Sequence, residues 1–266
     1  MLGPLRLEYR NVTMRFAKTG GAEVLTAVRK VSFAVRDGEV VSLIGPSGCG
    51  KSTLLNIGSG LTAPSEGAAF VDGDVVARPK PQVAFMLQKD LLLPWRTVAE
   101  NVMFGLEVRG VALKERIRRA DALLDNFNLS EFSAHFPHQL SGGMRQRVAL
   151  ARTLAVDPHI LLLDEPFSAV DAQTRMVLQS DLAQTLMRAN KTALLITHDL
   201  AEAVTLSDRI LVMSRRPGTI IDEIAIDLPL RDNPIARRRD LKFNDYMAWL
   251  MDRLDIAHAS LEQATP

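Results

Sequence analysis

Two hydrophobic patterns alternate along the chain and predict two kinds of secondary structure. Short apolar runs of strand length occur at 40–45, 82–87, 160–164, 192–197 and 208–213. Longer stretches with apolar residues at helical spacing occupy 97–110, 113–127, 142–155 and 171–189. Strands that alternate with helices form mostly parallel sheets with both faces covered. The middle of the chain has helical patterns only, and it predicts a helical insert within an α/β core.

The two ends of the chain depart from this alternation. Residues 5–16 and 28–35 are β-type runs on either side of the turn KTGGAE, which predicts an antiparallel β subdomain at the N-terminus. The C-terminal part contains prolines, a basic run and one helical pattern, FNDYMAWLMDRL. The predicted organisation is an α/β core at 1–88 and 156–227, a helical subdomain at 89–155 and a mainly helical extension at 228–266.

Charge and cysteine content narrow the classes of protein. The chain has 266 residues, with 32 lysines and arginines against 31 aspartates and glutamates, so no nucleic-acid partner is expected. Cys49 is the one cysteine, which excludes an intramolecular disulfide and favours a reducing, cytoplasmic setting. The N-terminus lacks the apolar region of a signal peptide, and no apolar run has the length of a membrane span. We therefore expect a chain that does not cross a membrane by itself.

A glycine-rich loop, GPSGCGKST, lies between a predicted strand and a predicted helix and matches the phosphate-loop pattern. Its backbone N–H groups close around phosphate oxygens, and the helix start adds a positive dipole end. Lys51 reaches the β- and γ-phosphates of a nucleotide, and the Ser52 hydroxyl binds Mg²⁺. The predicted phosphate-binding residues are Gly45, Pro46, Ser47, Gly48, Cys49, Gly50, Lys51, Ser52 and Thr53.

Polar side chains follow three other predicted strands. Asp164 and Glu165 end ILLLDE, His198 ends TALLITH, and Gln88 follows QVAFML. Parallel α/β sheets bind ligands at the carboxyl ends of their strands, which brings these groups to one edge. Asp164 suits a Mg²⁺ ligand, and Glu165 suits a general base that polarises the attacking water. Taken singly, each has a structural alternative, a solvated strand end for the carboxylates and a structural or surface residue for His198.

A second anion-binding feature lies in LSGGMRQR. Ser141, Gly142 and Gly143 open a predicted helix, so their hydroxyl and N–H groups form another positive helix end. The motifs follow in the order GPSGCGKST, Gln88, LSGGMRQR, ILLLDEP, SAVD and His198. In this order they resemble the ATP-binding subunits of ABC transporters, as far as about Asp227.

This resemblance implies a P-loop NTPase of RecA-like fold that hydrolyses ATP with Mg²⁺. It implies head-to-tail homodimers, in which each ATP lies between the phosphate loop of one copy and the LSGG turn of the other. Asp171 then lies at that interface, and Gln88 senses Mg²⁺ or the γ-phosphate. Lys51, Glu165 and His198 act in turnover. Phe16 stacks on adenine by resemblance, although its pattern alone equally fits a core residue.

The segment LLPW…TV…NV and the stretch LDEPFSAVDAQTR resemble nitrate/sulfonate/taurine-type importer ATPases. This implies a peripheral protein on the cytoplasmic face of the inner membrane, bound to integral membrane permease subunits. A solute-binding protein would deliver the solute to those subunits. Leu91 to Trp95 and the following helix then offer an apolar groove for a permease helix. A place for Trp95 in the subdomain core is the alternative. The transported solute stays open because a cassette does not contact it.

Other assignments compete with these. A soluble ABC ATPase acting on DNA or ribosomes, an exporter ATPase and a nucleotide-gated regulator are the alternative functions. His135 and His138 are a weak metal candidate, because no cysteine or acidic cluster accompanies them. The basic run at 236–242 suits anionic lipid or, more simply, a solvated helix face. The pattern FNDYMAWLMDRL leaves its packing partner open.

Overall fold

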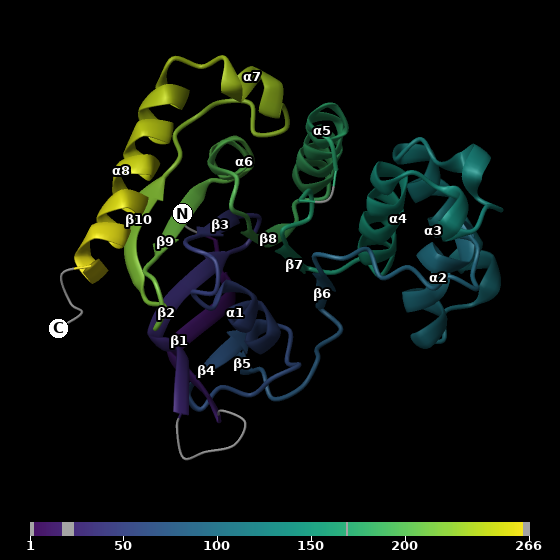
Figure 1. The fold of residues 1–266 in the computed structure, drawn as a ribbon. Coiled ribbons are helices and arrows are strands. Elements are labelled where there is room, and N and C mark those ends of the chain that lie inside the picture. Colours follow the sequence, from purple (N-terminus) through teal and green to yellow (C-terminus); the bar gives the residue numbers. More distant parts are fainter. Residues whose placement is uncertain (1–2, 18–23, 169, 263–266) are drawn as a thin grey trace.

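The computed structural model describes residues 3–17, 24–168 and 170–262. Figure 1 shows two lobes, a large one that contains both sheets and a smaller one made of helices. The predicted turn KTGGAE at 18–23 lies outside the described residues. The α/β class predicted from the alternating patterns is confirmed, with a mainly parallel core sheet and an N-terminal antiparallel sheet.

The core sheet has the strand order β10-β9-β3-β8-β7-β6 among the described residues. Neighbouring strands from β9 to β6 are parallel, and only β10 pairs antiparallel, with β9. The strands in chain order are β3 (Val40–Ile44), β6 (Val83–Met86), β7 (Ile160–Asp164), β8 (Thr192–Ile196), β9 (Arg209–Met213) and β10 (Ile220–Ala225). The sequence patterns indicated all of these strands except β10.

The central strands are continuous apolar runs because both of their faces are covered. Every residue of β3, β7 and β8 is buried. Successive side chains of a strand point to opposite faces, and β7 illustrates the result. Ile160 and Leu162 face the core shared with the antiparallel sheet, whereas Leu161 and Leu163 face the core shared with the helical lobe. One strand therefore joins both hydrophobic cores.

The antiparallel sheet packs over helix α1 (Lys51–Gly58), which follows β3. Its order is β2-β1-β4-β5, and its strands are β1 (Leu5–Ala17), β2 (Val24–Arg36), β4 (Glu66–Val71) and β5 (Asp74–Val75). The sequence patterns missed β4 and β5, which are short and half exposed. Buried Tyr9 connects sheet and helix, because its hydroxyl donates to the Leu54 carbonyl oxygen at 2.8 Å.

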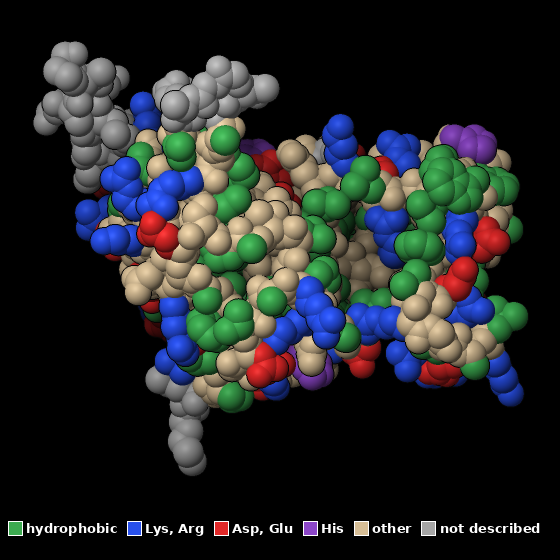
Figure 2. All heavy atoms as spheres, turned by 90° about the horizontal axis from the view of Figure 1, so that it is seen from below, with side chains coloured by type: hydrophobic (Ala, Val, Ile, Leu, Met, Phe, Trp, Pro, Cys, Tyr) green, Lys and Arg blue, Asp and Glu red, His purple; other side chains and the backbone are tan. Residues whose placement is uncertain are grey.

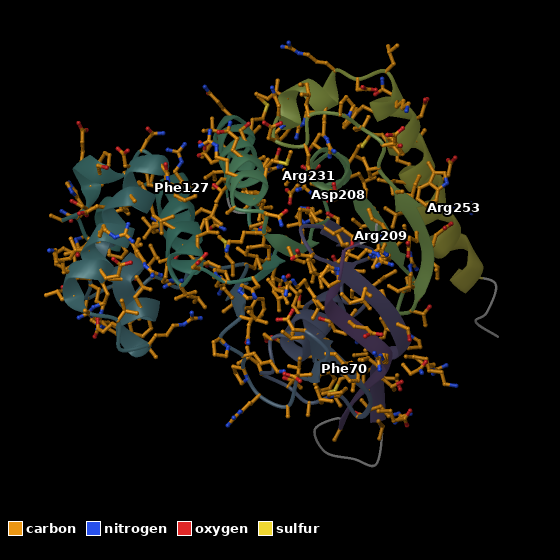
Figure 3. The ribbon with its side chains drawn as sticks, turned by 180° about the vertical axis from the view of Figure 1, so that it is seen from behind. Phe70, Phe127, Asp208, Arg209, Arg231 and Arg253 are labelled. Carbon is orange, nitrogen blue, oxygen red and sulfur yellow. The ribbon has the colours of Figure 1, made fainter. Side chains whose placement is uncertain are left out.

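The helical lobe is built from three helices and two short 3₁₀ turns, at Ser130–Phe132 and Pro137–Gln139. The helices are α2 (Val98–Val108), α3 (Leu113–Asn126) and α4 (Gly142–Ala155). Thr97 and Glu100 form a reciprocal capping box that fixes the start of α2. Buried Phe127, labelled in Figure 3, closes the lobe's apolar core after α3.

Helices α5 (Ala172–Arg188) and α6 (Leu200–Leu206) follow β7 and β8, and the C-terminal extension adds α7 (Pro234–Arg238) and α8 (Lys242–Glu262). Figure 1 shows α8 running along β10 at the outer edge of the large lobe. Leu250 is fully buried with residues of α6, β9 and β10. The helical pattern FNDYMAWLMDRL therefore packs on the core of its own chain.

Arginines fasten the extension to the core. Arg231 pairs with Asp208, and its Nη1 donates to the Gly38 carbonyl oxygen at 2.9 Å; Figure 3 labels this pair and Arg253, which bridges to Asp222 at 2.9 Å. Arg237 is 3% exposed and donates to carbonyl oxygens at the end of α6 and in the segment before α7, those of Thr205, Ser207, Leu228 and Pro229. Both predictions for the basic run, lipid contact or a solvated face, are therefore wrong for Arg237, because those carbonyls draw its guanidinium inward.

Candidate active site

The phosphate loop joins the end of β3 to the start of α1. Gly45 has φ 155° and Gly50 has φ 105°, and a side chain at either position would collide with neighbours, Met213 O at 2.9 Å and Val28 Cγ1 at 2.4 Å. These glycines let the backbone turn tightly and approach its surroundings. Lys51 Nζ donates to the carbonyl oxygens of Gly45 at 2.7 Å and Pro46 at 3.1 Å. The lysine thus lies over the loop.

Asp164 lies beside the first residues of α1. Ser52 Oγ donates to Asp164 Oδ1 at 3.2 Å, which brings together two of the three predicted Mg²⁺ ligands, the third being Gln88, from positions 112 residues apart. Asp164 is only 8% exposed, and burial raises the pKa of its carboxyl group above the usual value. A hydroxyl oxygen next to a desolvated carboxyl oxygen is the hard-oxygen set that Mg²⁺ prefers. The residues present therefore fit a magnesium ion.

Glu165, at the end of β7, contacts polar side chains that follow the two neighbouring strands, β6 and β8. Its Oε2 accepts from Gln88 Nε2 at 3.0 Å and lies 3.1 Å from His198 Nδ1. The sheet order explains this contact, because β6, β7 and β8 are neighbours and all end at the same edge. The structure therefore brings Gln88, Glu165 and His198 together, as the strand-end pattern predicted.

These groups line an open cleft of about 650 Å³. Phe16 lines it together with Leu25 and Ala27 of β2, and the Phe16 side chain is 42% exposed. The alternative prediction, that Phe16 is a buried core residue, is wrong. The complete lining is Phe16, Leu25, Ala27, Ser47, Gly48, Gly50, Lys51, Ser52, Thr53, Gln88, Glu165, His198 and Arg216. Gly45, Pro46 and Cys49 belong to the loop but do not line this cleft, and Cys49 is buried beneath it.

The LSGG turn lies elsewhere. Ser141 caps α4 by accepting from Met144 N at 3.3 Å, and Gly142 and Gly143 form the first turn of that helix. Gly142 borders a separate pocket of about 680 Å³ together with Arg145, and none of the turn's residues lines the phosphate-loop cleft among the described residues. Figure 1 shows α4 in the helical lobe and α1 in the large lobe. One chain therefore does not combine its two phosphate-binding features.

Asp171 caps the N-terminus of α5. Its Oδ1 accepts from the backbone N–H groups of Gln173 at 3.1 Å and Thr174 at 3.0 Å, which caps the start of α5. Those hydrogen bonds, led by Thr174, hold the pKa of Asp171 below its usual value. Ala169 of the SAVD stretch lies outside the described residues. The predicted interface role of Asp171 stays a prediction.

The structure adds two residues that the sequence patterns did not single out. Arg216, in the connection from β9 to β10, lines the cleft and contacts the phosphate loop. Glu202, on α6, is buried behind Glu165 and His198 beside a small cavity that all three line. No motif marked either residue, and only the run RRPG after a predicted strand could have drawn attention to Arg216. Among the described residues no metal-ligating cluster of three or more forms, and neither His135 nor His138 enters one.

Comparison with known proteins identifies the family of this site. The family model described as ABC transporter matches residues 28–168, more than half of the chain. The chain belongs to the ABC transporter family. An uncharacterized ABC transporter ATP-binding protein of Methanocaldococcus jannaschii is 45% identical over 250 residues, covering 94% of this chain and 91% of that protein. The taurine import ATP-binding protein TauB of Jannaschia sp. is 41% identical over 249 residues, covering 93% and 92%.

A solved structure agrees with this ABC assignment. The ATP-binding cassette MJ0796, a dimer in a post-hydrolysis state bound to ADP and Pi, matches with a TM-score of 0.74 and 33% identity, over 83% of this chain and 98% of that one. The predicted P-loop NTPase fold is thereby confirmed. The chain is an ATPase of the ABC transporter kind, as its motifs predicted. No helix among the described residues is long and apolar enough to cross a membrane.

Proposed function

We propose that this ABC ATPase energises an importer of a small solute, of the nitrate/sulfonate/taurine type or a related small organic compound, by ATP-driven head-to-tail dimerisation. The observation that carries the proposal is the spatial separation of its two phosphate-binding features. The cleft holds the groups for hydrolysis, and the LSGG turn lies apart from it on an exposed helix start. The taurine import proteins among the relatives support the importer class.

The phosphate loop binds the triphosphate. Lys51 exchanges its carbonyl contacts for phosphate oxygens, and the N–H groups at the start of α1 face the same anion. Ser52 and Asp164 hold Mg²⁺, either directly or through water, and Gln88 joins them from the neighbouring strand end. When bound, the metal neutralises charge on the β- and γ-phosphates. Phe16 stacks on the adenine ring at the outer end of the cleft.

Glu165 acts as the general base that takes a proton from the attacking water. Its carboxylate is held by Gln88 and His198, so it needs little rearrangement to accept a water at the γ-phosphate side. The His198 contact requires a proton on Nδ1 if it is a hydrogen bond to the carboxylate. His198 thereby orients Glu165 and keeps the water in line with the γ-phosphate.

A second copy of the chain completes the site. Ser141, Gly142 and Gly143 of one copy offer a hydroxyl and the N–H groups of a helix start to the γ-phosphate held by the other copy. ATP is then contacted from both sides, and its hydrolysis removes the bridging phosphate. The dimeric state of the related cassette MJ0796 supports this arrangement.

The permease docks on the segment between Gln88 and α2. Leu91 is 53% exposed and Trp95 is 71% exposed, so the alternative that Trp95 belongs to the lobe's core is wrong. Figure 2 shows hydrophobic side chains gathered on the surface of the helical lobe, at the right. Buried Asn101 gives the segment its shape, since it bonds the backbone of Leu93 on both the N–H and C=O side. An apolar, pre-shaped surface suits a short helix of a membrane subunit.

The docking segment is fastened to the helix that carries the LSGG turn. Arg145 Nε on α4 donates to Asp90 Oδ2 at 3.0 Å, and Arg152 donates to the carbonyl oxygens of Asp90 and Leu91. Movement of the docked permease is therefore transmitted to α4 and to the partner's ATP. The assembly places the chain peripherally on the cytoplasmic face of the inner membrane, where a solute-binding protein supplies the permease from the other side.

The test is the isolation of tagged Glu165→Gln protein from gently solubilised membranes of the native host, with ATP and Mg²⁺ present. We expect a polytopic membrane protein to co-purify, and mass spectrometry identifies it. Trp95→Ala in the same background should reduce its recovery, whereas Leu241→Ala, which removes an exposed apolar side chain of the C-terminal extension, serves as the control. Recovery of ribosomal or DNA-associated proteins alone would overturn the transport assignment.

A further inference from the structure

The connection between β9 and β10, residues 213–219, encloses the outer side of the phosphate loop. It touches the loop at three successive places. Met213 O lies 2.9 Å from where a side chain on Gly45 would begin, and Cys49 O lies 2.0 Å from where a side chain on Gly218 would begin. Between them, Arg216 Nε and Nη2 donate to the Gly48 carbonyl oxygen at 3.0 and 2.8 Å.

The connection is itself fixed to the antiparallel sheet. Gly218 N donates to the Ala27 carbonyl oxygen at 2.9 Å, and Arg29 N donates to the Gly218 carbonyl oxygen at 2.9 Å. Arg216 therefore extends from a backbone that is held on its other side by β2. It connects this support to the middle of the phosphate loop.

The contact controls the orientation of one peptide group. Gly48 has φ 75°, and a glycine peptide rotates easily unless something outside restrains it. In a planar trans peptide the carbonyl and the following N–H point in opposite directions. With the Gly48 carbonyl fixed on Arg216, the N–H of the same peptide, that of Cys49, donates to the Pro46 carbonyl oxygen across the loop, with 3.3 Å between nitrogen and oxygen. The inside of the loop is where phosphate oxygens bind.

Arg216 also belongs to the wall of the nucleotide cleft. It lines the cleft together with Lys51 and Ser47, so its guanidinium adds positive charge beside the triphosphate. We infer that Arg216 is a positioning residue for ATP, which holds the Gly48 peptide from outside and complements the phosphate charge. This inference rests on the proposed role of the phosphate loop as the nucleotide cradle.

Three variants test the inference with the full-length protein. Arg216→Ala removes both hydrogen bonds and the charge, and Arg216→Lys keeps the charge but cannot donate from two guanidinium nitrogens at once. Arg118→Ala is the matched control, because Arg118 is an exposed arginine on α3 that pairs with Glu115 at 2.7 Å. Each is titrated with a fluorescent ADP derivative, assayed for the KM and kcat of ATP hydrolysis, and melted without nucleotide.

We expect Arg216→Ala to raise Kd and KM about five- to tenfold, while kcat and the nucleotide-free Tm stay near wild type. Arg216→Lys should recover part of the affinity, and Arg118→Ala should behave as wild type. Wild-type Kd and KM in Arg216→Ala would overturn the inference. So would a fall in kcat at unchanged KM, or a loss of affinity as large in the control.

Lys51→Ala separates failure of this inference from failure of the proposed function. Loss of ADP binding in Lys51→Ala with normal binding in Arg216→Ala would sink only the role of Arg216. Wild-type ADP binding in Lys51→Ala would instead overturn the assignment of the phosphate loop, and the role of Arg216 with it.

Discussion

The phosphate loop and the LSGG turn are two anion-binding features built in opposite ways. The phosphate loop bends through glycines at positive φ, carries Lys51 across its own carbonyls and is backed by residues 213–219. The LSGG turn is supported differently, since its glycines are the first residues of α4, the Ser141 hydroxyl accepts from Met144 N, and Arg145 Nη1 donates to the Leu140 carbonyl oxygen. In the proposed shared site the loop supplies one half, and the turn, a helix start, completes the other half from a second copy.

The largest expected effect is on ATP hydrolysis, through Glu165 in the phosphate-loop cleft. Glu165→Gln keeps the size of the side chain and its neighbours Gln88 and His198 but removes the base. We expect hydrolysis to fall by about a thousandfold, within the usual range for loss of a positioned general base, while ATP still binds. Phosphate release and ATP titration measure the two quantities. Glu131→Gln, in the helical lobe, is the control, and near-normal turnover in Glu165→Gln would rule out its role as base.

A smaller effect is expected at the turn. Ser141→Ala loses the cap of α4, worth about 1 kcal/mol in helix stability, and one donor to the partner's γ-phosphate. We expect kcat to fall about tenfold while ADP affinity stays at the wild-type value, since ADP is bound by the loop alone. Thr97→Ala, which loses the same kind of cap on α2, separates the stability effect. Weakened ADP binding in Ser141→Ala would mean that both features serve one site within one chain.

The last prediction concerns stability rather than turnover, at the carboxyl group buried behind Glu165 and His198. Glu202 is buried, Gln179 Nε2 lies 3.4 Å from its Oε2, and burial raises the pKa of Glu202 to about 8. Between about pH 4.5 and 8 the Glu202 carboxyl group has lost its proton in the unfolded chain but retains it in the folded chain. The free energy of unfolding therefore falls as pH rises, by at most about 1.4 kcal/mol per pH unit.

Glu202→Gln removes this titration. We expect the variant to show a flatter dependence of Tm on pH than wild type between pH 5 and 8, and to be the more stable protein at pH 8. Below about pH 4.5 the Glu202 carboxyl group is protonated in both the folded and the unfolded chain. The two proteins should then show the same dependence of Tm on pH. Parallel melting curves across the range would contradict a protonated Glu202 in the folded protein.

Much of the site could be predicted because it depends on short-range patterns. A strand, a glycine loop and a helix in direct succession specify the phosphate loop, and apolar strands that end in Gln88, Glu165 and His198 must meet at one sheet edge. The contacts of Glu165 with both neighbours, a hydrogen bond from Gln88 and the 3.1 Å approach of His198 Nδ1, follow from that topology. Patterns of this kind are visible in the sequence since each is complete within a few residues.

The rest depends on contacts between distant segments. Arg216 contacts Gly48 across 168 positions, and Arg237 becomes buried because carbonyl oxygens of two separate stretches, 205–207 and 228–229, converge on it. Periodicity cannot distinguish such an arginine from a solvated one. Strands β4, β5 and β10 were missed for a related reason. β5 and β10 lie at sheet edges, β4 lies between β1 and β5, and all three carry exposed residues and lack a continuous apolar run.

The most direct test of the central claim is the mass of Glu165→Gln in solution, measured by light scattering with and without ATP and Mg²⁺. The account predicts one chain without nucleotide and twice that mass with ATP, because ATP bridges the loop of one copy and the turn of the other. The double variant Glu165→Gln, Ser141→Ala should dimerise less. A Glu165→Gln protein that binds ATP and keeps the mass of a single chain would contradict the shared-site account.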